Sequence, residues 1–166
     1  MKRRRSNRRA AFETFYFVGT TVATAAVLYA MLPVWLGGAF LGMHLIHEMG
    51  HYAVLAHFDQ KPWLPFFIPL FFIVRGTTAY EGEDPEHLRK AALAGPLAGL
   101  VFALAMAAFC LWMGFIDGAF AAGWLALYNV YAALLGSDGR DYRRYTRAWR
   151  EASVPEEDLV SAPAFA

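Results

Sequence analysis

Three long runs without a charged residue constrain the fold of this chain more than any other feature. They cover residues 14–33, 91–116 and 118–137. A helix needs about 20 mostly apolar residues to cross the hydrocarbon core of a bilayer, and each run is long enough. The whole chain of 166 residues is 58% hydrophobic and 16% aromatic, well above the usage of soluble domains. The sequence therefore predicts an all-α integral membrane protein.

A fourth membrane helix is predicted over residues 40–57, which are apolar apart from a few histidines and one glutamate. The next segment, residues 63–74, is uncharged but contains Pro65 and Pro69. At about 1.5 Å per residue it is too short to cross a core of about 30 Å as a helix. We therefore expect about four transmembrane helices, with a re-entrant or β-type segment between the second and the third.

The basic residues gather at the two ends of the chain, although the formal net charge is only +1. Residues 1–13 form a basic head, residues 14–139 the predicted transmembrane core, and residues 140–166 an arginine-rich tail that turns acidic at 156–158. A basic head beside a spanning helix ordinarily holds the N-terminus in the cytoplasm, so we expect no nucleic-acid partner. A secretory signal is the weaker alternative, because the first run is long enough to span. Four spans then place both termini in the cytoplasm.

The predicted second helix contains the sequence His47-Glu48-Met49-Gly50-His51. Residues four apart on a helix lie nearly above one another, so His47 and His51 can bind one metal ion, with Glu48 beside them as a general base. Histidines and carboxylates are costly inside a bilayer, which favours a functional site over a chance match. Catalytic zinc usually takes three protein ligands and leaves one position for water, so a third ligand is expected elsewhere.

Two further residues are considered for the third position. His44 lies one turn before His47, but its spacing suits a partner of a ligand, or a histidine bonded within its own helix, better than a direct ligand. Most carboxylates lie in polar connections, whereas Asp138 follows a long apolar run and precedes Gly139. Asp138 also lies toward the same predicted side of the membrane as His51. A helix break at residues 136–139 would bring the two residues to a common depth.

The order and spacing of three motifs resemble the site-2 protease family of intramembrane zinc metalloproteases. The motifs are His47 to His51 in a membrane helix, Ala94-Gly95-Pro96 opening the next helix, and Ser137-Asp138-Gly139 at the end of the following one. The resemblance covers about residues 37–144. It implies a minimal core without the PDZ domain that some relatives carry. It also implies that residues 63–80 correspond to the family's re-entrant β-type segment.

The resemblance further implies a function and the residues that perform it. Zn²⁺ would be held by His47, His51 and Asp138, and Glu48 would be the catalytic base. The family's third motif commonly has an asparagine, prolines and then Asp-Gly, whereas no proline separates Asn129 from Asp138 here. Asn129 would donate to the developing oxyanion or position the substrate. The expected activity is hydrolysis of a peptide bond in or near a transmembrane helix of a membrane-anchored substrate, in the plasma membrane of a bacterium.

Two other functions compete with this interpretation. A noncatalytic membrane scaffold or regulator of the same fold is favoured by the altered third motif and disfavoured by the intact His-Glu-x-x-His sequence. A transporter could use His44, His47 and His51 as a transit site for metal, but four helices without a second inverted repeat argue against it. A membrane-protein substrate and the lipid bilayer are the predicted partners, and the sequence leaves the oligomeric state open.

Overall fold

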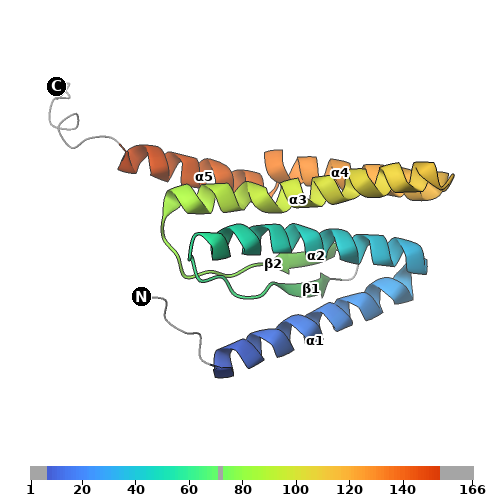
Figure 1. Cartoon of the computed structure of the whole chain (residues 1–166), viewed down its shortest axis with the longest axis horizontal. Helices are drawn as coiled ribbons and strands as arrows, with labels where there is room; N and C mark the ends of the chain where they lie inside the picture. The colour runs from blue at the N-terminus through green and yellow to red at the C-terminus, as the bar shows by residue number, and fades with distance from the viewer. Residues whose placement is uncertain (1–6, 71–72, 154–166) are drawn as a thin grey trace.

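The computed structural model describes residues 7–70 and 73–153, which form five helices and one two-stranded sheet. In chain order the elements are α1 (Asn7–Met31), α2 (Val34–His57), β1 (Phe66–Leu70), β2 (Ile73–Thr77), α3 (Pro85–Trp112), α4 (Ile116–Leu134) and α5 (Ser137–Ala152). The strands lie between α1 and α2, and α3, α4 and α5 form a layer on the other side of α2 (Figure 1). The predicted, mainly helical fold is confirmed.

Three helical segments among the described residues are long and apolar enough to cross a membrane: Arg8–Met31, Pro85–Trp112 and Ile116–Ala152, the last comprising α4 and α5. Large apolar side chains on α3 and α4 point outward, including Val101 at 67% exposure and Trp124 at 61%. A wide apolar surface of this kind suits lipid better than water. Three of the four predicted spans are therefore long and apolar enough to cross a membrane, which supports the prediction of a membrane protein. Helix α2 has 24 residues, but its histidines and glutamate lower its hydropathy, and its crossing stays a prediction.

The helix ends differ from those expected, because an uncharged run does not mark where the backbone turns. Helix α1 begins at Asn7 and so includes the last part of the predicted basic head. Lys2, Arg3, Arg4 and Arg5 of the head, and the acidic part of the tail, lie outside the described residues. Between α3 and α4 the chain turns at Gly114, which has φ of +71°, a conformation that glycine adopts without strain.

The predicted β-type segment is a hairpin of two antiparallel strands, with Phe66 opposite Thr77 and Leu70 opposite Ile73. Phe67 is only 1% exposed, and its backbone N–H donates to Thr20 Oγ1 of α1 at 3.3 Å. These contacts attach the hairpin to α1, while the end of β2 approaches α2. A re-entrant position in a membrane stays a prediction.

Small residues let α2 and α3 pack closely beside the site. A Cβ atom at Gly50 would lie 2.5 Å from the carbonyl oxygen of Ala94 and 2.9 Å from the Ala98 methyl group. The alanines at the start of α3 and Gly50 of α2 thus bring the two helix backbones close together. Deeper in the layer, Met43 of α2 contacts Ala103 of α3 and Leu125 of α4 in a buried apolar cluster.

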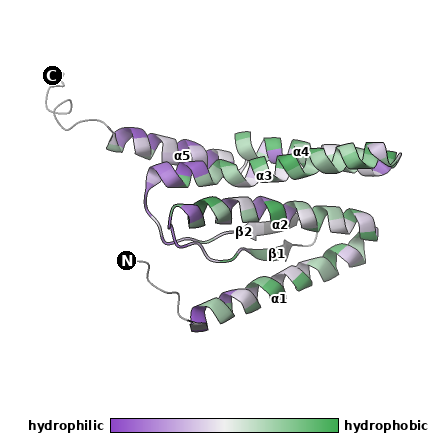
Figure 2. Cartoon of the chain, viewed as in Figure 1, coloured by the Kyte–Doolittle hydropathy of each residue, from purple (hydrophilic) through white to green (hydrophobic). Residues whose placement is uncertain are grey.

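A break separates α4 from α5 at Leu135 and Gly136, next to the break expected at residues 136–139. Arg143 of α5 donates to the carbonyl oxygen of Leu134 at 2.7 Å, which satisfies one of the free carbonyl groups at the end of α4. Hydrophilic residues gather at this end of the molecule, where α1 and α3 begin and α5 lies (Figure 2). Asp138 lies in the first turn of α5, directly after the break.

Candidate metal centre

The buried face of α2 carries the candidate site. His47 and Glu48 are each 7% exposed, and His51, one turn further on, is partly buried. Because α2 is covered by the hairpin on one side and by α3 and α4 on the other, these polar side chains are enclosed by protein although the helix is mostly apolar. The arrangement places them where other elements can supply partners.

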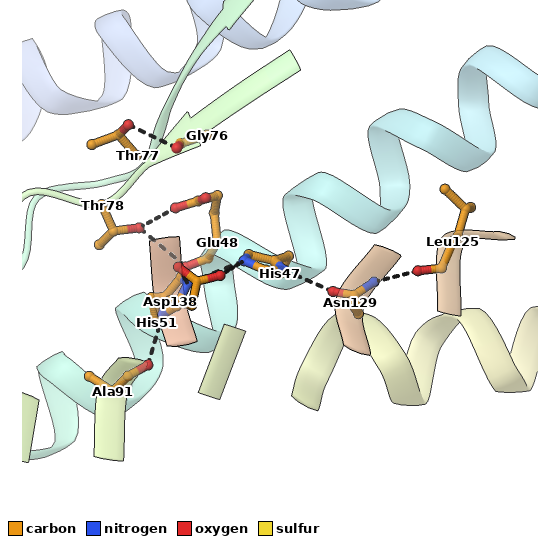
Figure 3. A network of polar contacts seen from close by, with 10 residues as sticks. All are labelled: His47, Glu48, His51, Gly76, Thr77, Thr78, Ala91, Leu125, Asn129 and Asp138. Carbon is orange, nitrogen blue, oxygen red and sulfur yellow. Dashed lines mark hydrogen bonds and ion pairs between the residues drawn. The ribbon is translucent and has the colours of Figure 1, made fainter. Parts of the chain in front are cut away.

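Three side chains converge at this place: His47, His51 and Asp138 (Figure 3). The Nε2 atom of His47 lies 3.3 Å from Nε2 of His51 and 3.2 Å from Oδ2 of Asp138. The distance from His51 Nε2 to Asp138 Oδ1 is 3.7 Å. The three groups are close enough together to hold one metal ion. The break before α5 makes this possible, because it lets Asp138 turn back toward α2.

The outer nitrogen of each histidine is held by another helix. His51 Nδ1 lies 2.7 Å from the carbonyl oxygen of Ala91 in α3, and His47 Nδ1 lies 2.8 Å from Oδ1 of Asn129 in α4. A carbonyl oxygen only accepts hydrogen bonds, so each Nδ1 carries a proton, and in the neutral ring each Nε2 presents a lone pair. Two lone pairs and a carboxylate then face one another, an arrangement that a cation stabilises and that is common around metal-binding histidines.

Two glycines of α3 leave room for these side chains. A Cβ atom at Gly95 would lie 2.6 Å from Cε1 of the His51 ring, and one at Gly99 would lie 2.7 Å from Cγ of Asn129. Both are far closer than a normal carbon contact. Any other residue at 95 or 99 would push a ligand, or the residue behind a ligand, out of place.

Asn129 lies behind His47 and is only 1% exposed. Its oxygen accepts from His47, and its amide nitrogen donates to the carbonyl oxygen of Leu125 at 2.8 Å. Asn129 is also absent from the lining of the cavity described below. The structure thus brings Asn129 to the site, but in a position that suits orienting His47 rather than contacting a substrate.

His44 is bonded within its own helix, as one of the two sequence-based interpretations expected. Its Nδ1 atom lies 2.8 Å from the carbonyl oxygen of Phe40, and its ring packs near Tyr128 with the centroids 5.7 Å apart. His44 lines the cavity but does not belong to the group that could hold a metal ion.

A cavity of about 560 Å³ opens in front of the three converging side chains, a volume typical of ligand sites. Glu48 faces this cavity. The lining residues that were not identified from the sequence include Thr78, Tyr80, Tyr128 and Tyr145. The hydroxyl groups of Tyr80 and Tyr145 are hydrogen-bonded to each other at the cavity wall. Burial and this bond raise the pKa of the Tyr80 phenol, so it stays neutral at physiological pH.

The fold and the site define a mainly helical chain that could cross a membrane, with a group of two histidines and one aspartate that could hold a metal ion. Compared with known proteins, the chain matches no family model, no curated protein and no solved structure. The function is therefore inferred from the site itself and from the motifs in the sequence.

Proposed function

We propose that this protein is a zinc-dependent intramembrane endopeptidase similar to the site-2 proteases. One observation carries the proposal: His47, His51 and Asp138 converge beside Glu48 in a single cavity between helices that could cross a membrane. Two histidines, a third ligand and a neighbouring glutamate are the groups that a zinc peptidase requires.

The spacing of the three ligand groups supports zinc. Tetrahedral zinc with bonds of about 2.0–2.1 Å separates its ligand atoms by about 3.3–3.4 Å. The two Nε2 atoms lie 3.3 Å apart, and the Asp138 carboxylate lies 3.2 Å from His47 through Oδ2 and 3.7 Å from His51 through Oδ1. Nitrogen and carboxylate ligands match zinc chemistry, and three protein ligands leave one position open, as in catalytic sites. When bound, zinc lowers the pKa of water toward about 7 and polarises a carbonyl group.

The protein's own residues would divide the remaining work. Asn129 orients His47 and the carbonyl oxygen of Ala91 orients His51, so the Nε2 atoms of both rings already point to the metal position before the metal ion binds. The Glu48 carboxylate faces the cavity, where it would accept a proton from the attacking water and deliver it to the amine that leaves. Asn129 would thus act through His47, and not as an oxyanion donor.

The membrane position follows from the distribution of charge. Hydrophilic residues gather at the end of the molecule that holds Asp138 and the arginines of α5 (Figure 2). By the positive-inside rule this end faces the cytoplasm. Helix α2 is then a membrane span in addition to the other three, and the hairpin between α2 and α3 is re-entrant. The substrate class is a membrane-anchored protein, whose transmembrane helix must unwind locally to expose a peptide bond, in the plasma membrane of a bacterium.

The test compares wild-type protein with Glu48→Gln in bacterial membranes. The amide cannot accept the proton, so we expect new protein N-termini, mapped by mass spectrometry, only with the wild type. Both purified proteins should contain about one zinc per chain by elemental analysis. Glu86→Gln is the matched control, because Glu86 is an exposed glutamate whose carboxylate pairs with Lys90 outside the cavity. Equal cleavage by wild type and Glu48→Gln would refute the mechanism. Absence of both zinc and cleavage would favour the noncatalytic scaffold.

A further inference from the structure

The end of strand β2 contacts the catalytic glutamate of the proposed site. Thr78, the residue directly after β2, donates its hydroxyl hydrogen bond to Glu48 Oε2 at 2.8 Å (Figure 3). The same hydroxyl lies 3.3 Å from the backbone carbonyl oxygen of Glu48. No other described residue forms a hydrogen bond with this carboxylate. The orientation of the carboxylate is therefore set from the hairpin.

Gly76 provides the space in which the carboxylate lies. A Cβ atom at this position would lie 2.5 Å from Cγ and 2.6 Å from Cδ of Glu48. Glu48 thus fills the volume that a side chain at 76 would occupy, and its carboxylate rests against the strand. Thr78 supplies a donor and Gly76 supplies room, two independent features directed at one side chain.

We propose that Thr78 is a positioning residue that holds Glu48 in the orientation needed to accept a proton. Gly76 leaves the space in which the Glu48 side chain lies. This inference rests on the proposed peptidase function. A glutamate side chain has several rotatable bonds, and holding one oxygen restricts them before the reaction begins. The hairpin, which is attached to α1, therefore controls the base on α2.

The kinetic test replaces Thr78 by Val, which keeps the shape and removes the hydroxyl, and by Ser, which keeps the hydroxyl. The substrate is a fluorogenic peptide that spans the bond cleaved most by the wild type in membranes. We expect Thr78→Val to lower kcat by about 10- to 100-fold, because a small misplacement of a catalytic group has an effect of this size. KM and zinc content should not change, and Thr78→Ser should restore kcat. A wild-type kcat in Thr78→Val would overturn the proposal.

Two further variants separate positioning from a general loosening of the hairpin. Gly76→Ala should lower kcat while the protein still folds, because the added methyl group meets the flexible end of Glu48 and not the backbone. Thr20→Val removes the hydrogen bond that attaches β1 to α1 and makes no contact with Glu48, so its kcat should stay at the wild-type value. An equal loss in Thr20→Val and Thr78→Val would assign the effect to the hairpin as a whole and refute positioning.

A double-mutant cycle tests the contact without any cleavage. Melting temperatures are measured in detergent with a chelator present, for wild type, Thr78→Val, Glu48→Ala and the double variant, so that bound metal does not contribute. Thr78→Val should lower the melting temperature in the wild-type background and change it little in the Glu48→Ala background. Additive shifts would overturn the proposal. If the wild type shows no cleavage and no zinc, the peptidase function fails, while this cycle still decides whether Thr78 holds Glu48.

Discussion

Replacement of Asn129 separates the two roles that the sequence left open for this residue. In the structure Asn129 Oδ1 accepts from His47 Nδ1 at 2.8 Å, and the whole side chain is 1% exposed. Asn129→Ala removes the acceptor and leaves a buried N–H group without a partner. We therefore expect weaker metal binding, whereas loss of an oxyanion donor would lower kcat and leave metal affinity unchanged.

The size of the effect follows from two independent considerations. Removal of the partner behind a metal-bound histidine typically weakens metal binding by about 10- to 100-fold, which corresponds to about 1.4–2.8 kcal/mol. An unsatisfied buried donor costs about 1–3 kcal/mol. The first range is a loss of metal affinity and the second a loss of folding stability, and both follow from removal of the Asn129 acceptor. A water molecule could replace the lost acceptor only in a space that is large enough and polar. Gly99, which has no side chain, packs against one side of the space left by the amide.

The assay is competition for zinc between the purified protein and a fluorescent chelator at constant pH. Asn129→Ala should release zinc at a chelator concentration about 10- to 100-fold lower than the wild type. In Asn129→Asp the carboxylate still accepts from His47 but no longer donates to the Leu125 carbonyl oxygen, so we expect a smaller loss of affinity than in Asn129→Ala. An Asn129→Ala protein with wild-type zinc affinity and a reduced kcat would refute the orienting role and restore the oxyanion role.

Local sequence signals were sufficient for much of the fold. The uncharged runs predicted α1, α3 and α4, and the prolines at 65 and 69 predicted that the next segment is not a helix; β1 contains Pro69. The exact turns were not predictable, since apolar composition reflects burial or lipid contact and carries little information on backbone direction. Gly37 lies inside α2, and a ring carbon of Tyr29 of α1 lies 2.8 Å from where its Cβ would be.

The candidate site was predictable to the extent that it lies on one helix. His47, Glu48 and His51 follow from helical spacing, and the motif resemblance added Asp138, which the structure brings to them. Thr78 was not identified, because nothing in a threonine after a strand indicates which helix it will meet. Its contact with Glu48 spans 30 positions in sequence and depends on how the hairpin packs on α2.

The remaining predictions concern the third ligand, the glycine beside His51 and the helix break. Asp138→Ala should lower the zinc content measured by elemental analysis; an unchanged content would point to another ligand. Gly95→Ala should weaken zinc binding in the chelator assay by about 10-fold or more, because His51 is held by the Ala91 carbonyl oxygen and cannot move away from the new methyl group. Arg143→Gln weakens the contact with the Leu134 carbonyl oxygen that holds the start of α5. A protein that loses this contact should bind zinc less tightly, because Asp138 reaches the histidines only while α5 turns back across the break. Wild-type affinity in Arg143→Gln would show that the packing of α5 on α3 holds Asp138 without the arginine.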